Sequence, residues 1–82
     1  MTDPFLTLDL HGMRQEQAIR VIDRALLRAD PGVYQIRLVH GYRGGDSLKT
    51  MIGYRYRAHP KVKRIVHDDN PGVTVFVLKD LC

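Results

Sequence analysis

The sequence has 82 residues, of which 44% are hydrophobic, and it carries a formal net charge of +4. This length allows one hydrophobic core, and the composition excludes a disordered chain. The single cysteine, Cys82, excludes an intrachain disulfide, as is usual for proteins of a reducing compartment. No apolar run approaches the ~20 residues of a membrane span, and the N-terminus lacks the features of a targeting segment. We therefore expect residues 1–82 to form a single cytoplasmic domain that does not bind a membrane.

The positive charge is concentrated in the second half of the chain. Between His40 and Ile65 seven basic residues face one acidic residue, which gives this stretch a charge of +6, whereas the remaining chain sums to −2. The basic residues are Arg43, Lys49, Arg55, Arg57, Lys61, Lys63 and Arg64. Such a separation favours a polyanionic partner. A solvated face that binds nothing has the same composition, and charge alone does not distinguish RNA, DNA and a membrane surface.

The first part of the chain has the periodicity of a strand followed by a helix. Alternating leucines over residues 5–11 predict a strand, and Gly12 interrupts it. Apolar residues at spacings of three and four over residues 14–29 predict an amphipathic helix. Another face of this helix carries charged residues four apart, namely Glu16, Arg20, Arg24 and Arg28. Asp30-Pro31-Gly32 ends the helix.

The second part of the chain continues with a strand, a helix and a hairpin. A strand over residues 34–39 completes a βαβ unit, which is expected to be parallel and right-handed. After a glycine-rich segment, residues 40–45, a helix is predicted from residue 46 or 47 to about 58. Residues 62–67 and 73–78 predict an antiparallel hairpin. The order β-α-β-α-β-β predicts an α/β fold, a two-layer α+β sandwich with a four-stranded mixed sheet and two helices on one face.

Two His-Gly segments follow the two predicted parallel strands. His11 lies at the carboxyl end of the first strand, and His40 lies at the carboxyl end of the second. Ligands of open α/β sheets gather at this edge, where helix N-termini also point. We therefore expect residues 8–12 and 40–45 to converge on one surface.

The second His-Gly segment has the residue types that bind a phosphate. Its glycines let backbone N–H groups approach a ligand, and the helix start that follows favours an anion. Arg43 and Lys49 add positive charge, and the ring of Tyr42 is available to stack on a base. An ordinary strand-to-helix turn is the plainer interpretation. The candidate phosphate-binding residues are Gly12, Gly41, Tyr42, Arg43, Gly44, Gly45 and Lys49.

The catalytic candidates are Asp9, His11 and His40. Asp9 and His11 share a face of the first strand because strand side chains alternate, and a carboxylate beside an imidazole orients it and raises its basicity. Two histidines flanking a phosphodiester cleave RNA when one removes the 2′-hydroxyl proton and the other protonates the leaving oxygen, so His40 is the candidate partner acid or base to His11. Alternatively, Asp9 holds a divalent cation, Mg²⁺ or Mn²⁺, that stabilises the same transition state. A hydrogen-bonded structural pair is the plainer interpretation, and no Cys or His spacing indicates a zinc site.

The motif Leu8-Asp9-Leu10-His11-Gly12, followed by an amphipathic helix and a strand that ends in His40-Gly41, resembles the Smr (small MutS-related) domain. The later stretches Leu48-Lys49, His59-Pro60-x-Val62 and Gly72–Leu78 fit the same pattern, so the resemblance covers nearly the whole chain. It implies a sandwich like the C-terminal domain of bacterial translation initiation factor three. It also implies nucleic-acid binding, with endonuclease activity on DNA or RNA in several members.

The resemblance assigns the functional positions to Asp9, His11, His40 and Gly41. The chain departs from the family in the second motif, where the family has His-Gly-x-Gly, a further glycine and Leu-Arg. Here Arg43 stands at the position of the second glycine, the segment is one residue longer, and lysine follows Leu48. The altered glycine pattern predicts a phosphate cradle of different shape and favours binding over catalysis.

Three functions stay open at the level of sequence. The first is an endonuclease that cleaves RNA or nicks branched DNA, and the second is a non-catalytic module that binds RNA or branched DNA. The third is a protein-interaction domain whose basic face serves solubility, and the charge separation argues against it. The set Asp9, His11 and His40 favours the first, since binding alone does not need an imidazole beside a carboxylate. We expect a monomer, although nothing in the sequence determines the oligomeric state.

Overall fold

Six elements form a four-stranded sheet with two helices in the computed structural model, which describes residues 3–41 and 46–80. They are β1 (Phe5–Asp9), α1 (Gln15–Arg28), β2 (Gln35–Val39), α2 (Asp46–Tyr56), β3 (Arg64–His67) and β4 (Val73–Val77). Every predicted element is present in the predicted order, and the predicted fold class is confirmed. Three boundaries differ from the prediction by two residues: β1 ends early, at Asp9, α2 ends early, at Tyr56, and β3 begins late, at Arg64. The late start of β3 follows from the Val62 N–H, which closes a turn on the carbonyl of His59 at 3.0 Å.

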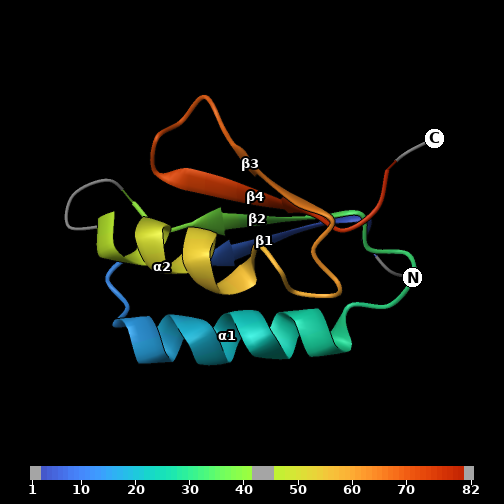
Figure 1. Ribbon diagram of the computed structural model, residues 1–82, viewed down its shortest axis with the longest axis horizontal. Helices are drawn as coiled ribbons and strands as arrows, with labels where there is room; N and C mark the ends of the chain where they lie inside the picture. Colours follow the sequence, from blue (N-terminus) through green and yellow to red (C-terminus); the bar gives the residue numbers. More distant parts are fainter. Residues whose placement is uncertain (1–2, 42–45, 81–82) are drawn as a thin grey trace.

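The strands lie in the order β1-β2-β4-β3, and the sheet is mixed. β1 and β2 are parallel, whereas β4 is antiparallel to both of its neighbours. The parallel pair has α1 as its crossover connection, which a parallel pair requires. In Figure 1, β1 and β2 both end at the left of the sheet, and the N-terminal ends of α1 and α2 lie at that same side.

One core lies between the sheet and the two helices. The helices bury residues four apart, which keeps them on one stripe: Ala18, Ile22 and Leu26 from α1, and Leu48, Ile52 and Tyr56 from α2. These residues form one cluster with Ile36, Leu38 and Phe76 of the sheet. Both helices therefore cover the same face of the sheet, as predicted and as Figure 1 shows.

Tyr56, the last residue of α2, joins the two helices. Its side chain is 1% exposed, and its hydroxyl donates to a carboxylate oxygen of Asp23 at 2.6 Å. Burial, and then the neighbouring Asp23, raises the pKa of the Tyr56 phenol far above its usual value. Tyr54, two residues earlier, is 71% exposed. The two tyrosines thus have different roles, one in the core and one on the surface.

Within the described residues no helix has the length and apolar character needed to cross a membrane.

Candidate functional site

The two His-Gly segments meet at the edge where the parallel strands end. Asp9 is paired with Val39 in the parallel ladder, and the N–H of Leu10 donates to the carbonyl of Val39 at 2.7 Å. His11 and Gly41 then lie side by side, because a Cβ built on Gly41 would be 3.7 Å from the Cβ of His11. The predicted convergence of the two segments is therefore confirmed.

Both segments turn on a glycine with a left-handed backbone. Gly12 has φ +76° and Gly41 has φ +77°, a region that L side chains rarely adopt. Steric crowding does not explain the need for glycine, since a Cβ on Gly12 would meet nothing within 4 Å. The two segments therefore need glycine for the direction in which the backbone leaves each strand.

Replacing Gly41 with alanine should lower the free energy of unfolding by about 1–2 kcal/mol, the cost of a left-handed backbone with a Cβ. Gly53, inside α2, is the matched control because a Cβ there also meets nothing within 4 Å. Gly53→Ala should raise the free energy of unfolding by roughly 0.5–1 kcal/mol, since alanine favours a helix. Urea unfolding of both variants measures the two effects, and effects of the same sign would contradict the backbone explanation.

The carbonyl of Gly72 holds the second segment in place from the turn before β4. It accepts hydrogen bonds from the N–H groups of His40 and Gly41, at 2.9 and 3.0 Å. The N–H of Gly72 donates to the side chain of Asn70 at 2.9 Å. The sheet edge thus joins three segments of the chain. The third, residues 70–72, was not among the predicted site residues.

Asp9 and His11 form an exposed hydrogen-bonded pair. The Nδ1 of His11 lies 2.5 Å from Oδ1 of Asp9, and the backbone N–H of His11 donates to the same oxygen at 3.2 Å. The side chain of His11 is 71% exposed, and that of Asp9 is 64% exposed. The carboxylate forms a hydrogen bond with Nδ1 of the ring, and no group in the described part of the chain forms one with Nε2. The pair therefore presents a ring nitrogen to solvent beside Gly41.

The electrostatics of this pair favour a protonated imidazole. The hydrogen bond to Asp9, and then its charge, raises the pKa of His11 above its usual 6.5. Reciprocally, the hydrogen bonds from His11 lower the pKa of the Asp9 carboxyl. The contact stabilises the fold between the ordinary pKa of a carboxyl and that of an imidazole. This contribution is lost as the pH rises through the raised pKa of His11 or falls through the lowered pKa of Asp9.

We expect NMR titration of the His11 ring to give a pKa above 6.5, the ordinary value of the imidazole. Asp9→Asn should move that pKa back toward the ordinary value because the amide keeps an acceptor oxygen and loses the charge. The control is Asp68→Asn, which removes a carboxylate that contacts Arg37 instead. A His11 ring that titrates at the same pH in wild type and Asp9→Asn would show that Asp9 does not set its pKa.

His40 lies on the inner side of the same edge. Its side chain is buried, with 2% of the residue exposed, and both ring nitrogens contact the protein. Nδ1 lies 2.8 Å from the carbonyl oxygen of Gly41, and Nε2 lies 2.9 Å from the hydroxyl of Thr74. A carbonyl only accepts, so Nδ1 carries the proton, and in the neutral ring Nε2 accepts from the Thr74 hydroxyl.

These contacts give His40 a positioning role toward the site. Its ring fixes the carbonyl of Gly41, and Gly41 in turn lies against His11. An acid–base role for His40 stays a prediction, and it would require the ring to exchange the Thr74 hydrogen bond for one to a substrate. Thr74 itself was missed in the sequence, although a hydroxyl residue between valines in an otherwise apolar strand was a signal of a buried polar contact.

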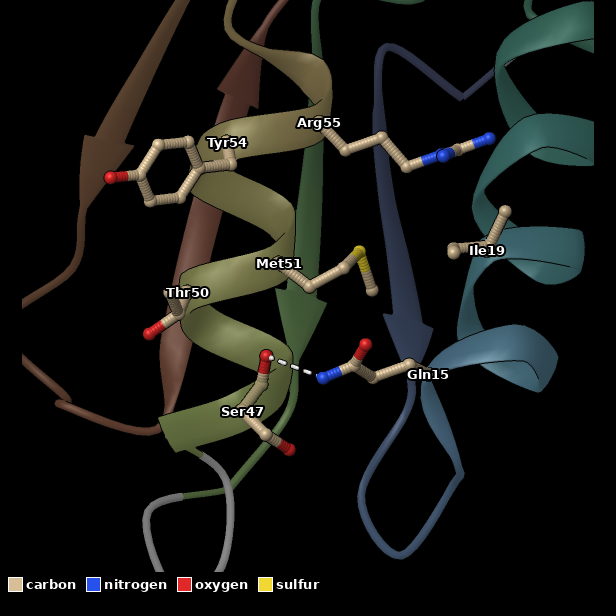
Figure 2. A pocket seen from close by; sticks show the side chains of 7 residues that line it. All are labelled: Gln15, Ile19, Ser47, Thr50, Met51, Tyr54 and Arg55. Atoms are coloured by element: carbon tan, nitrogen blue, oxygen red, sulfur yellow. Dashed lines mark hydrogen bonds between the residues drawn. The ribbon is translucent and has the colours of Figure 1, made fainter.

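The remaining predicted binding residues are only partly described. Tyr42, Arg43, Gly44 and Gly45 lie outside the described residues, so their phosphate-binding role stays a prediction. Lys49 is half-buried in α2, close to the N-terminus of that helix. Figure 2 shows how the helix N-termini are joined: the side-chain amide of Gln15 donates to the carbonyl of Ser47 at 3.4 Å, across the groove between α1 and α2.

The basic stretch of the sequence divides into two groups in space. Lys61 donates to the carbonyl of Leu26 at 2.6 Å and so caps the C-terminal end of α1. Lys63 and Arg64 contact the carboxylate of Asp80, at 2.5 and 2.8 Å. Arg64 is paired with Val77, at the end of the sheet opposite to His11. These three cations therefore stabilise the far end of the fold, whereas Lys49, in the first turn of α2, lies at the end of that helix nearer the site.

A metal ion at this edge would use Asp9. Within residues 3–41 and 46–80 no three or more His, Cys, Asp or Glu side chains come together as a metal site. Mg²⁺ is often bound by one or two carboxylates together with substrate phosphate oxygens. Asp9 fits a cation that arrives with a phosphodiester, and its second oxygen would be the ligand because Oδ1 contacts His11.

The sequence and the fold both match known proteins. The family model for the Smr domain matches residues 8–79, which include both His-Gly segments and Thr74. Among solved structures, the crystal structure of the Smr domain of Thermus thermophilus MutS2 superimposes with a TM-score of 0.81 at 29% sequence identity. That match covers 92% of this chain and 99% of the other. The comparison with curated proteins found no relative.

Proposed function

The chain belongs to the Smr domain family, whose members generally bind nucleic acid and in some cases cleave it, and we propose that it is an endonuclease that cleaves RNA or nicks DNA. The observation that carries the proposal is the exposed Asp9–His11 pair beside Gly41. A binding surface needs positive charge, whereas an oriented imidazole with a raised pKa is what a general acid needs.

In the proposed reaction His11 is the general acid. Its protonated Nε2 donates a proton to the oxygen that leaves phosphorus, while Asp9 holds Nδ1 and stabilises the imidazolium. The attacking oxygen is the 2′-hydroxyl in RNA or water in DNA, and its proton passes to a base. His40 stays the predicted partner for that step. Gly12, Gly41, residues 42–45 and Lys49 are proposed to bind the phosphate.

A non-catalytic binding module is the second candidate. Two observations favour it: the burial of His40, whose ring nitrogens both contact the protein, and the altered glycine pattern of the second segment. In this function the imidazolium of His11 contacts a phosphate and transfers no proton. Asp9 then serves only to keep that ring charged.

A cleavage assay separates the two candidates. The purified protein is incubated with labelled single-stranded RNA and with supercoiled plasmid, in Mg²⁺, in Mn²⁺ and in chelator, with Asp9→Ala and His40→Ala in parallel. The endonuclease proposal expects products from the wild type and their loss in Asp9→Ala. Equal cleavage by wild type and both variants would indicate a contaminating nuclease, and binding without cleavage would favour the second candidate.

Binding should weaken steeply as the salt concentration rises, because lysine and arginine displace counterions from phosphates. Lys49→Gln should reduce the slope of log affinity against log salt by about 0.7, the value for one single-strand phosphate contact. Lys63→Gln is the matched control, since Lys63 contacts Asp80 at the opposite end of the sheet. Fluorescence anisotropy at several salt concentrations gives the slopes. Equal slopes for wild type and Lys49→Gln would exclude a phosphate contact of Lys49.

A further inference from the structure

A hollow of about 310 Å³ lies on the side of α2 that faces away from α1. The residues that line it come from α2, from the residue after it and from the end of β3, and they are Lys49, Thr50, Gly53, Tyr54, Arg57 and His67. Figure 2 shows Thr50 and Tyr54 pointing away from α1, while Met51 and Arg55 point toward it. We call this hollow the α2–β3 pocket.

An exposed aromatic ring forms one wall of the α2–β3 pocket. Tyr54 is 71% exposed, and the guanidinium carbon of Arg57 lies 5.3 Å from the centre of its ring. A cation at this distance from a ring makes a cation–π contact. One exposed ring is ordinary on a protein surface. A ring with a guanidinium, a lysine and a histidine in one hollow is the combination that single-strand binding proteins use.

The positive charge of the α2–β3 pocket is not neutralised within the described residues. Neither Lys49 nor Arg57 has an ion pair with a described carboxylate, whereas Lys63 and Arg64, at the other end of the sheet, both contact Asp80. The nearby carboxylate of Asp68 forms an ion pair with Arg37 on the open face of the sheet. The pocket therefore offers cations to an anionic ligand.

The α2–β3 pocket is connected to the Asp9–His11 edge through two contacts. His67 is paired across the sheet with Thr74, and the hydroxyl of Thr74 contacts His40 at 2.9 Å. Lys49 lies near the start of α2, and Tyr54 follows it by about 7.5 Å along the helix axis at the usual rise.

We propose that the α2–β3 pocket binds an unpaired nucleotide of the same strand whose phosphodiester is held at His11, so that the substrate of the site is a single-stranded segment. The base stacks on Tyr54, and the phosphate lies between Lys49 and Arg57. A duplex does not fit this contact because its bases are already stacked on each other and are not free for a side chain. This inference rests on the proposed nucleic-acid function and specifies its substrate class.

Binding of short labelled oligonucleotides tests the pocket directly. Fluorescence anisotropy compares single-stranded RNA and DNA with a fully paired hairpin of the same length. Tyr54→Ala should weaken single-strand binding roughly 5- to 100-fold, the usual effect of removing one stacking ring. Tyr54→Phe keeps the ring and should bind as the wild type does. Arg57→Ala should weaken single-strand binding as well, and hairpin binding should be the same in all three variants.

Phe5→Ala is the matched control, because Phe5 is an aromatic side chain of the sheet, 46% exposed, at the end of β1 opposite to His11. It should leave single-strand binding unchanged. The inference is overturned if Tyr54→Ala binds the single strand as the wild type does, if it weakens the hairpin equally, or if Phe5→Ala has the same effect. Circular dichroism melting confirms that each variant is folded before its affinity is compared.

Failure of the pocket and failure of the proposed cleavage give different results. If Tyr54→Ala loses single-strand affinity and no condition yields products, the pocket stands and the endonuclease proposal fails. If products depend on His11 and Tyr54→Ala binds and cleaves as the wild type does, the pocket fails alone. If the wild type binds neither oligonucleotide, both fail.

Discussion

His11→Ala is expected to slow phosphodiester cleavage by about 100- to 10,000-fold, the usual contribution of a positioned general acid. The affinity for an uncleaved strand should change only a few fold, because the basic residues of α2 and the backbone near Gly41 remain. Single-turnover rates and anisotropy on the same oligonucleotide measure the two quantities. A variant that loses affinity while its single-turnover rate at saturating protein is unchanged would show that His11 binds and does not catalyse.

Asp9→Asn separates the two effects of the carboxylate on His11. The amide oxygen still accepts from Nδ1, so the ring keeps its orientation. The hydrogen bond to an ionised carboxylate, and with it the negative charge, which together raise the pKa of His11, are lost. We expect an intermediate rate and a pH–rate profile whose alkaline limb moves to lower pH. Asp68→Asn, which affects only the contact with Arg37, should leave the profile unchanged. An Asp9→Asn profile that coincides with the wild type would contradict the acid role.

His40→Ala is expected to lower the free energy of unfolding by about 2–4 kcal/mol. The change opens space in a buried site and leaves the Gly41 carbonyl and the Thr74 hydroxyl without their partner, and each such loss costs about 1–3 kcal/mol. Urea unfolding gives the value. Thr74→Val should cost less, because it removes one of the two contacts. The double variant should show coupling between the two residues, and strictly additive costs would contradict the hydrogen bond.

The activity of His40→Gln distinguishes positioning from direct catalysis. Glutamine keeps a donor and an acceptor in the buried site, and an ionisable ring is lost. If His40 only positions Gly41, the pH–rate profile keeps its shape and the rate falls at all pH values. If His40 exchanges protons with the substrate, one limb of the profile disappears.

The order of elements could be predicted from the sequence because it depends on local patterns. Each of these patterns extends over only a few residues: the alternating leucines of β1, the apolar spacings of three and four in α1, and the Pro-Gly pair that ends α1. The edge at which ligands gather then follows from the parallel βαβ unit alone. The late start of β3 could not be predicted in this way, because the turn from His59 to Val62 competes with the strand for the same N–H group.

The burial of His40 was indicated by the same alternation, although it was not predicted. His40 continues the series Ile36 and Leu38, which face the core, whereas His11 continues the series of Thr7 and Asp9, which face the open side. Because strand side chains alternate between the two faces, the side chain of His11 faces solvent and that of His40 faces the core. The two histidines lie at equivalent strand ends but have different roles, because their side chains point to opposite faces of the sheet.

The division of the basic stretch could not be predicted from a count of charges. Lys61 caps α1 across 35 residues of chain, and Lys63 contacts Asp80 across 17. Contacts between residues so distant in sequence depend on the sheet order β1-β2-β4-β3, which a linear charge profile does not contain. Positive charge near a motif in sequence is thus weaker evidence for a binding face than positive charge near it in space.

The central claim is that nucleic acid binds where the two His-Gly segments meet, and an NMR titration tests it most directly. A short single-stranded oligonucleotide is added to ¹⁵N-labelled protein, and the backbone amide shifts are followed. The account predicts the largest changes at His11, Gly12 and Gly41, with little change at Lys63 and Arg64. Changes concentrated at the Asp80 end of the sheet, with none at Gly12 and Gly41, would contradict it.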